Sequence, residues 1–406
     1  MSSSDRFLNQ LPEILFGDIV ELLSEKVSSS EITLQNYIST ENMIPNCGGV
    51  VKASSLPKAT KFNSFYESDT LFSNIRTYFR KVWSAEFSGG ASADVLIFRS
   101  KDRFKLDPRF LYYLVSNKEF VDFTDRTSKG AKMPRGDKDA IVKYPLHLPS
   151  VDEQKSIASV LGALDDKIEN NRRMNETLEK MARAIFKSWF VDFDPVHAKA
   201  AGNAPVHMDA DTAALFPNSF GDDGLPVGWE IKKLEDVMEL AYGKALKASN
   251  RIDGQVPVYG SGGITGSHNE ALVDGPSVII GRKGTVGSLF WEDRPFFPID
   301  TSFYLKPKIE LTFCYYLLQT LKLDNMNTDA AVPGLNRNNV YRLEFTMPSQ
   351  NCLSEFQKVV GLMRGKIRSN SDESQTLAEL RDTLLPKLMS GAIRTSDAER
   401  EVEAAV

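Results

Sequence analysis

"PSVDEQKSIASVLGALDDKIENNRRMNETLEKMARAIFKSWF", residues 149–190, decides the fold of this 406-residue chain because the chain contains it twice. The diverged second copy, "PSQNCLSEFQKVVGLMRGKIRSNSDESQTLAELRDTLLPKLM", occupies residues 348–389. The two copies align without a gap at an offset of 348 − 149 = 199 residues, which places Gly162 on Gly361 and Asn171 on Asn370. An ungapped match of this length indicates an internal duplication.

Each copy has the pattern of one long helix. Ser150 followed by Glu153 forms a capping box, which predicts a helix start. Seam positions then recur at alternating steps of four and three residues, as in a coiled coil. In the first copy they are Ile157, Leu161, Leu164, Ile168, Asn171, Asn175, Leu178, Ala182, Ile185 and Trp189; in the second they are Phe356, Val360, Met363, Ile367, Asn370, Ser374, Leu377, Arg381, Leu384 and Leu388. We therefore expect two helices of roughly 50 Å that pair along seams with a polar centre.

The second copy departs from the first at two places. Cys352 stands where the first copy has Glu153, which weakens the expected capping box. Pro386 predicts that the second helix kinks or ends near Leu385, because proline lacks the backbone N–H that a helix interior requires.

The duplication also includes the residues ahead of each helix. "AKMPRGDKDAIVKYPLHLPS" from Ala131 aligns at the same offset with "AAVPGLNRNNVYRLEFTMPS" from Ala330. Short β-branched and aromatic runs alternate there with glycine turns, which predicts mixed α+β domains. The expected segments are a domain at 1–148, a long helix at 149–191, a linker at 192–226, a domain at 227–347, a long helix at 348–392 and an acidic tail at 393–406.

Composition limits the possible function classes. The stretch "MSSSDRFLNQLPEILF" has no basic region followed by a sustained apolar run, and no segment approaches the length of a membrane-spanning helix, so we expect a cytoplasmic protein without a membrane partner. Its three cysteines lie far apart and suggest neither a disulfide framework nor a zinc site. The net charge is −5, but acidic residues concentrate at 192–223 and 397–403, so the remainder is net positive. Basic patches at 72–105 and 126–143 are either solvated faces or phosphate contacts.

No catalytic motif is complete. "GSGGITG" at 260–266 lacks the last glycine of a dinucleotide fingerprint, and "GRKGTVG" at 281–287 lacks the Gly-Lys-Ser/Thr end of a P-loop. The four histidines have no metal-ligand spacing. We therefore predict no catalytic residues, no cofactor and no metal, and we keep a nucleotide-using enzyme as one alternative.

Two pairs of loops, equivalent in the two halves, carry the residue types that contact DNA. "SNIRTYFRKVW" from Ser73 corresponds to "IIGRKGTVGSLFW" from Ile279, and "RTSKGAKMPRGDK" from Arg126 corresponds to "PGLNRNN" from Pro333. For any single side chain, a salt bridge or a turn role is an equally good interpretation. The predicted DNA-binding residues are Arg76, Tyr78, Arg80, Lys81, Lys129, Lys132, Arg135, Lys244, Arg282, Lys283, Asn336, Arg337 and Asn338.

The residues that carry a family resemblance are the first long helix with its flanks, "LPSVDEQ" from Leu148 through "VDFDPV", then "GLPVGWEIKKLEDV" from Gly224, "SNIRTYFRKV" and the weaker second helix. On these stretches the chain resembles the DNA specificity subunits of type I restriction-modification systems. The resemblance implies two target-recognition domains, held apart by two antiparallel coiled-coil helices with a pseudo-twofold relation, that read a bipartite, asymmetric double-stranded DNA target. It also implies two adenine-methylating modification subunits and ATP-dependent restriction endonuclease subunits as partners. A non-catalytic subunit is then expected, since methyl transfer and ATP use belong to those partners.

A coiled-coil adaptor without DNA specificity is the other alternative. It predicts no salt-sensitive DNA binding, whereas a DNA reader loses affinity steeply as the salt concentration rises.

Overall fold

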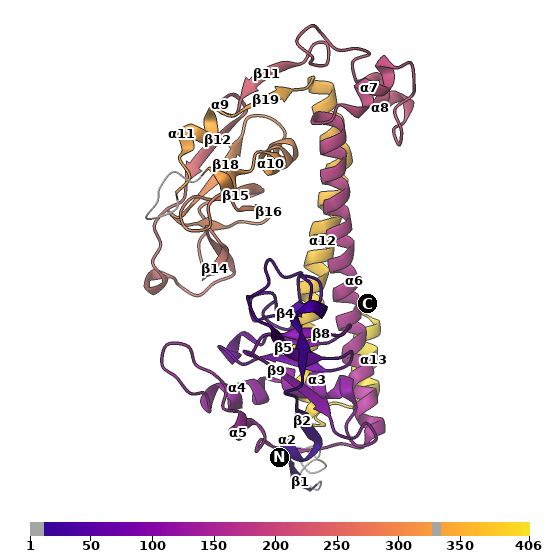
Figure 1. Ribbon diagram of the computed structural model, residues 1–406, viewed down its shortest axis with the longest axis vertical. Helices are drawn as coiled ribbons and strands as arrows, with labels where there is room; N and C mark the ends of the chain where they lie inside the picture. Colours follow the sequence, from indigo (N-terminus) through magenta and orange to yellow (C-terminus); the bar gives the residue numbers. More distant parts are fainter. Residues whose placement is uncertain (1–11, 327–333) are drawn as a thin grey trace. The chain divides into compact units, whose positions relative to one another are not determined.

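The computed structural model describes residues 12–326 and 334–406, and these residues form two compact units. The first unit comprises the chain up to Arg172 together with Ser371–Val406, and the second comprises Arg173–Asn370. The two long helices are α6 (Val151–Phe190) and α12 (Gln350–Met389), each 40 residues long (Figure 1). Each helix therefore contributes one half to each unit, and both unit boundaries fall at the predicted polar centre of the seam.

A serine hydroxyl caps the start of each long helix, which is the serine half of the predicted capping box in the first helix and is kept in the second despite Cys352. The Ser150 hydroxyl accepts the Glu153 backbone N–H at 3.3 Å, and the Ser349 hydroxyl accepts the Cys352 N–H at 3.4 Å. Cys352 is fully buried, and its Sγ lies 3.3 Å from the Leu215 carbonyl oxygen. Packing against the linker therefore accounts for the cysteine, since the side chain of glutamate at this position would have to be buried.

The second long helix does not end near Leu385 but continues to Met389 with Pro386 inside it, so the prediction of an end there was wrong. Leu384, Leu385 and Leu388 are all buried, and their packing holds this turn in the helix. Both the backbone N–H and the hydroxyl of Ser390 donate to the Pro386 carbonyl, which satisfies the last turn.

The first unit contains two four-stranded sheets, ordered β2-β9-β6-β7 and β3-β5-β8-β4, and a two-stranded sheet, β1-β10. Its elements besides the long helices are β1 (Glu13–Leu15), α2 (Phe16–Ile19), β2 (Val20–Leu22), β3 (Lys26–Ser28), η1 (Ser29–Glu31), β4 (Tyr37–Ile38), β5 (Lys61–Phe65), β6 (Thr70–Ser73), η2 (Thr77–Phe79), β7 (Val82–Ser84), β8 (Gly89–Ala91), β9 (Val95–Ser100), α3 (Pro108–Ser116), α4 (Lys118–Arg126), α5 (Lys138–Ile141), β10 (Pro145–His147) and α13 (Thr395–Glu403).

The second unit repeats this plan with sheets β12-β18-β15-β16, β14-β13-β17 and β11-β19. Its elements are α7 (Asp194–Ala200), α8 (Ala210–Ala214), β11 (Glu230–Lys233), α9 (Leu234–Val237), β12 (Met238–Tyr242), η3 (Ala248–Asn250), β13 (Val256–Gly260), β14 (Gly263–His268), β15 (Ser277–Gly281), β16 (Leu289–Glu292), β17 (Phe297–Pro298), β18 (Ser302–Pro307), α10 (Leu311–Thr320), η4 (Leu323–Asn325), α11 (Arg337–Tyr341) and β19 (Glu344–Met347).

The two four-stranded sheets β2-β9-β6-β7 and β12-β18-β15-β16 are antiparallel throughout and connect equivalent elements. A largely apolar helix with two adjacent tyrosines, α3 in the first unit and α10 in the second, packs in each unit's hydrophobic core together with one half of α6 and one half of α12. The α+β fold with an internal duplication is therefore confirmed.

Segments outside the repeat also join these cores. The predicted acidic tail folds as α13, whose Ala398 and Val402 are buried in the core of the first unit. The predicted linker contains α7 and α8, and Val196 and Phe216 are buried in the core of the second unit. The apolar residues of α7, α8 and α13 lie within short acidic stretches, and for this reason the sequence pattern did not predict these three helices.

Both seams lie where the heptad pattern predicts, because every seam residue of α6 and α12 is buried or half-buried. In the first unit, the Asn171 amide donates to the Ser374 hydroxyl at 3.3 Å. In the second, the Asn370 amide donates to the Asn175 side-chain oxygen at 2.9 Å. Rising numbers on α6 meet falling numbers on α12 in each unit, so the paired half-helices are antiparallel.

Across the described ranges 12–326 and 334–406, no helix combines the length and hydrophobicity of a membrane span. In the same residues, no group of three or more metal-ligating side chains gathers.

Candidate nucleic-acid interface

In the first unit, the two predicted loops form one surface. Ile75 and Arg135 form an antiparallel bridge, and the Arg76 N–H donates to the Pro134 carbonyl at 3.1 Å. Lys129 and Arg135 exchange backbone hydrogen bonds of 2.8 and 2.9 Å. The loop after β6 is therefore held against the loop before α5 by backbone contacts, which do not depend on the side chains that each loop exposes.

A tight 3-10 turn at the edge of this surface exposes aromatic rings. Arg76 and Arg80 flank η2 with φ of 50° and 48°, in the left-handed region that costs free energy for residues with a side chain. Tyr78 and Phe79, between them, are 50% and 39% exposed, and their ring centroids lie 4.7 Å apart. Together with the exposed Arg76, this turn presents a cation beside two aromatic faces.

Three further cations of this surface point into solvent. Lys132 is exposed, Lys129 pairs with Asp137 at 2.6 Å, and Arg135 pairs with Asp94 at 2.9 Å. The hydrogen bond from Lys129 lowers the pKa of Asp137. The Lys129 and Arg135 side chains are 76% and 55% exposed, and exposed ion pairs of this kind are weak enough for a phosphate to replace the carboxylate.

Arg80 and Lys81 serve packing instead. The Arg80 guanidinium makes two hydrogen bonds to Asp382 of α12, at 2.9 and 3.2 Å, and its side chain is only 17% exposed. The Lys81 ammonium donates to the Thr40 carbonyl at 2.6 Å. Both side chains are bound inside the unit, so we do not propose Arg80 and Lys81 as DNA contacts.

In the second unit, two predicted arginines meet on one aromatic ring. The guanidinium carbons of Arg282 and Arg337 lie 4.9 and 5.0 Å from the centroid of Tyr242. Arg282 also donates to the Asp300 carbonyl at 2.9 Å. Cation–π contacts and hydrogen bonds thus fix both guanidinium groups before any ligand arrives.

The backbone joins these loops as in the first unit. Leu335 donates its N–H to the Arg282 carbonyl at 2.8 Å, and Lys283 forms an antiparallel bridge with Gly334. Lys244, Lys283, Asn336 and Asn338 are exposed around the two arginines' loops. Asn336 also caps α11, since its side-chain oxygen accepts the Asn338 N–H at 2.9 Å. Part of the predicted loop, residues 327–333, lies outside the described residues.

The same construction therefore occurs twice. In each unit, the turn after the third strand of the four-stranded sheet, β6 or β15, is bonded to the loop before a short helix, α5 or α11. The predicted pairing of loops is confirmed as a structural equivalence, while their contacts with DNA stay a prediction.

Sequence reasoning missed Tyr242, the half-exposed ring under both arginines. The signal was weak, since tyrosine at the end of the alternating strand "MELAY" is an ordinary strand residue. Only the approach of loops about 40 and 95 residues further along the chain gives it a role.

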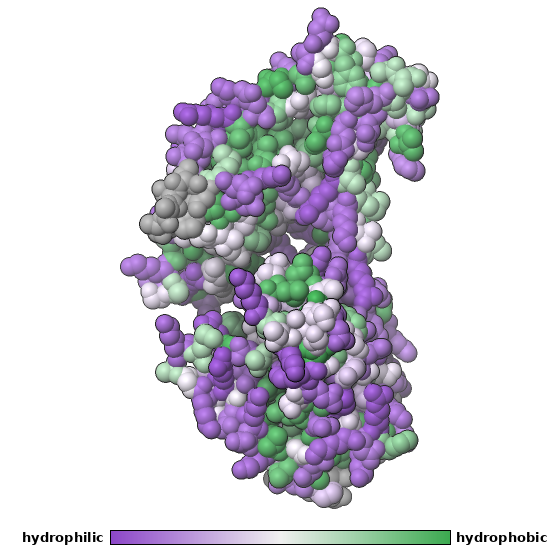
Figure 2. All heavy atoms as spheres, viewed as in Figure 1, coloured by the Kyte–Doolittle hydropathy of each residue, from purple (hydrophilic) through white to green (hydrophobic). Residues whose placement is uncertain are grey.

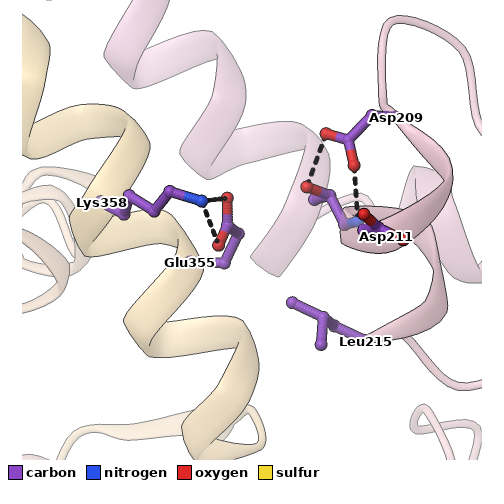
Figure 3. Close-up of a pocket in the computed structure, with 6 residues that line it drawn as sticks. Asp209, Asp211, Leu215, Glu355 and Lys358 are labelled. Carbon is purple, nitrogen blue, oxygen red and sulfur yellow. Dashed lines mark hydrogen bonds and ion pairs between the residues drawn. The ribbon is translucent and has the colours of Figure 1, made fainter.

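The pocket shown in Figure 3 lies elsewhere in the second unit, between α8 and α12. It is lined by Asp209, Asp211, Thr212, Leu215, Glu355 and Lys358. Glu355 pairs with Lys358 at 3.2 Å, and Asp209 accepts hydrogen bonds from Thr212. Three carboxylates against one ammonium would repel a phosphate, so this pocket is not part of the candidate interface.

The visible face of each unit carries many hydrophilic side chains, with hydrophobic ones in smaller patches (Figure 2).

Comparisons with known proteins agree with this arrangement. A sequence model of the family described as "Type I restriction modification DNA specificity domain" matches residues 17–180 and 226–359. The chain is 29% identical to the type I restriction enzyme HindI specificity subunit of Haemophilus influenzae, over 70% of this chain and 77% of that protein. It is 26% identical to the MjaIX specificity subunit of Methanocaldococcus jannaschii, over 71% of this chain and 69% of that protein.

A solved structure shares the fold. The S subunit of a type I restriction-modification system from M. genitalium matches 96% of this chain and 99% of its own length, with 20% identity and a TM-score of 0.51. The family match covers both halves of the chain and omits the segment between them, in agreement with the duplicated architecture.

Proposed function

Because this chain belongs to the family of type I restriction modification DNA specificity proteins, we propose that each of its units reads one half of a bipartite double-stranded DNA target. The observation that supports the proposal is the duplicated loop construction. The same backbone frame carries different side chains in the two units, Arg76 with Tyr78 in one and Arg282 with Arg337 in the other. Equivalent frames with different side chains suit an asymmetric target.

The side chains divide by the contacts that they suit. Exposed cations suit phosphate contacts that position the protein, and these are Lys129, Lys132, Arg135, Lys244 and Lys283, of which Lys129 and Arg135 form exposed ion pairs that a phosphate can replace. Arg282 and Arg337 are held in fixed planes on Tyr242, which suits bidentate contact with a guanine edge.

The proposed role is recognition without catalysis. The curated relatives are named as specificity subunits of type I restriction enzymes. We infer that this chain likewise supplies the target to separate modification subunits, which methylate adenine, and to ATP-dependent restriction subunits. Each unit pairs one half of α6 with one half of α12, so a modification subunit has two equivalent helical surfaces to bind.

The test is the methylation motif. Expressed with a modification subunit of its own system, the chain is expected to direct methylation of adenines in two short specified sequences separated by an unspecified spacer, read out by sequencing of modified bases. The purified chain alone should leave DNA unmethylated. A contiguous motif, or methylation that does not depend on the chain, would contradict the proposal.

Tyr242 offers a prediction for the second unit. Replacing Tyr242 with alanine removes the ring on which both guanidinium groups lie, and we expect about tenfold weaker binding of the methylation motif, since each cation–π contact contributes about 0.5–1 kcal/mol. Tyr242→Phe keeps the ring and should bind within about twofold of the parent chain. Fluorescence anisotropy of labelled DNA at a fixed salt concentration measures the affinity of both variants. Equal losses in the two variants would mean that the hydroxyl, not the ring, matters.

A further inference from the structure

The two long helices carry opposite charges at their contacts. In the first unit, Arg381 of α12 donates to Asp165 of α6 at 2.7 Å. In the second unit, Arg364 of α12 pairs with Glu179 of α6 at 3.2 Å. Both acids of these two ion pairs belong to α6 and both arginines to α12.

These ion pairs are largely shielded from water. The Arg381 and Arg364 side chains are 4% and 11% exposed, and those of Asp165 and Glu179 are 21% and 19% exposed. Reversal of one charge in such a pair is costly, because it brings two like charges together in a poorly solvated place. Each arginine also has a second acidic neighbour, Asp382 for Arg381 and Asp293 for Arg364, and Glu179 also pairs with Arg183.

In each unit, a tyrosine hydroxyl donates a hydrogen bond to the carboxylate of the ion pair. The Tyr113 hydroxyl of α3 donates to Asp165 at 2.7 Å, and the Tyr316 hydroxyl of α10 donates to Glu179 at 3.0 Å. In the first unit the acid lies on the long helix that follows the domain in sequence, and in the second it lies on the other long helix. The tyrosine therefore follows the carboxylate, not the duplicated position.

Alignment of the two copies shows that the charge is reversed between equivalent positions of α6 and α12. Asp165 aligns with Arg364 at the same offset, 364 − 165 = 199, so one ancestral position holds an acid in α6 and a base in α12. Glu179 aligns with Ala378, and Arg381 aligns with Ala182, one helical turn from Glu179.

Pairing of α6 with a second α6, or of α12 with a second α12, would therefore be unfavourable. If α6 met α6 of a second copy in the antiparallel register observed here, Asp165 would approach Glu179. If α12 met α12, Arg364 would approach Arg381. Each like pair would bring together two partly buried charges of the same sign at both ends, which is unfavourable at short range in a low dielectric.

Two other contacts between the long helices discriminate less. The central layer consists of Asn171, Asn175, Asn370 and Ser374, whose neutral side chains suit a like or an unlike pair equally. Lys167 and Glu373, at 3.4 Å, are each about one-third exposed, and an ion pair at this exposure contributes little.

We propose that these polarised ion pairs restrict the partner of each long helix, so that α6 accepts α12 and rejects another α6, and α12 likewise rejects its own kind. The duplicated chain then folds on itself, or exchanges halves only with the complementary half of another copy. This inference does not depend on DNA recognition.

The experiment separates α6 and α12 into two polypeptides, so that each helix can pair with a like or an unlike helix. A protease site is inserted between Gly202 and Asn203, in the exposed turn after α7, and the folded full-length chain is cut there. Isotope-labelled and unlabelled cut chains are mixed, unfolded together and refolded. Native mass spectrometry then counts pairs of unlike and like pieces, and label exchange within unlike pairs shows that partners were free to change.

Unlike pairs are expected to dominate, with each like pair below about 5%, against about one quarter each if the helices did not discriminate. The double variant Glu179→Arg with Arg364→Glu keeps a complementary pair in the native arrangement but gives each helix one acid and one base. Like pairs should then rise to about one quarter each. Abundant like pairs from the parent chain, or their continued absence from the double variant, would overturn the proposal.

A second measurement uses the uncut chain and does not require refolding. Glu179→Arg alone places two cations together and should lower the Tm by about 6 °C or more, and adding Arg364→Glu should restore most of the loss. If the single variant kept the parent Tm, or if the second substitution restored nothing, the pairs would not control helix pairing.

Discussion

Exchanging residues 1–147 for those of another family member is expected to change one half of the methylated motif and to leave the other half and the spacer unchanged. The reason is the position of the join. All strands and loops of the first candidate interface lie before His147, where β10 ends, and α6 begins at Val151 under its own Ser150 cap. The exchange therefore replaces one reading surface and keeps both helices.

The family member that supplies the exchanged domain must preserve two contacts between that domain and the long helices. Arg80 bonds to Asp382 of α12, and the Tyr113 hydroxyl donates to Asp165 of α6. A family member that lacks either side chain would leave the carboxylate with Arg381 as a remaining partner, and the lost hydrogen bond to this partly buried carboxylate would cost about 1–3 kcal/mol. Donors that carry arginine and tyrosine at the aligned positions should give stable chimaeras.

Sequencing of methylated adenines in cells that express the chimaera with the modification subunit measures the outcome. The reciprocal exchange of residues 227–347 serves as the control and should change only the other half of the motif. A change in both halves after either exchange would show that the two units do not read DNA independently.

Inserting four residues into each long helix at its polar centre is expected to lengthen the spacer by one or two base pairs while both specified halves stay the same. Four residues add about 6 Å of helix, and base pairs stack at about 3.4 Å. Insertion after Asn171 and after Asn370 keeps the two helices equal in length. Both sites fall at the boundary between the two units, where the seam residues Asn171, Asn175, Asn370 and Ser374 are polar.

The protein should tolerate this insertion, because a heptad seam absorbs four extra residues as a stutter with slight local unwinding. The methylated motif of the variant measures the spacer. A control insertion of the same four residues between Gly202 and Asn203, in an exposed turn, should leave the spacer unchanged. If an active double insertion kept the parent spacer, the helices would not set the distance between the half-sites.

Much of this architecture could be predicted from local patterns. The heptad spacing located both seams, because a buried stripe must recur every 3.5 residues wherever two helices pair. The ungapped offset of 199 residues identified the duplication, and with it the correspondence between loops of the two halves. The contact of the loops after β6 and β15 with those before α5 and α11 was visible only in the structure. The Ser150 cap and the acidic composition of the final residues were visible too, although the composition hid α13.

The roles of individual charges depended on contacts across the chain. Arg80 and Arg76 are both basic residues of one turn, but Arg80 meets Asp382, which lies 302 positions away, while Arg76 stays exposed. Arg381 was a seam position with no visible reason to be charged until Asp165 was found beside it. Tyr242 acquired its role when two separate loops placed arginines on its ring.

The sequence by itself thus determined which two segments are the long helices, which face of each is buried and which loops correspond, because these properties follow from periodicity and repetition along the chain. Only the tertiary structure decided which cations are free to meet DNA and which hold the fold together. The physical reason is that the free energy of a charge depends on its nearest partner and on its exposure to water, and both are set by residues far away in the sequence.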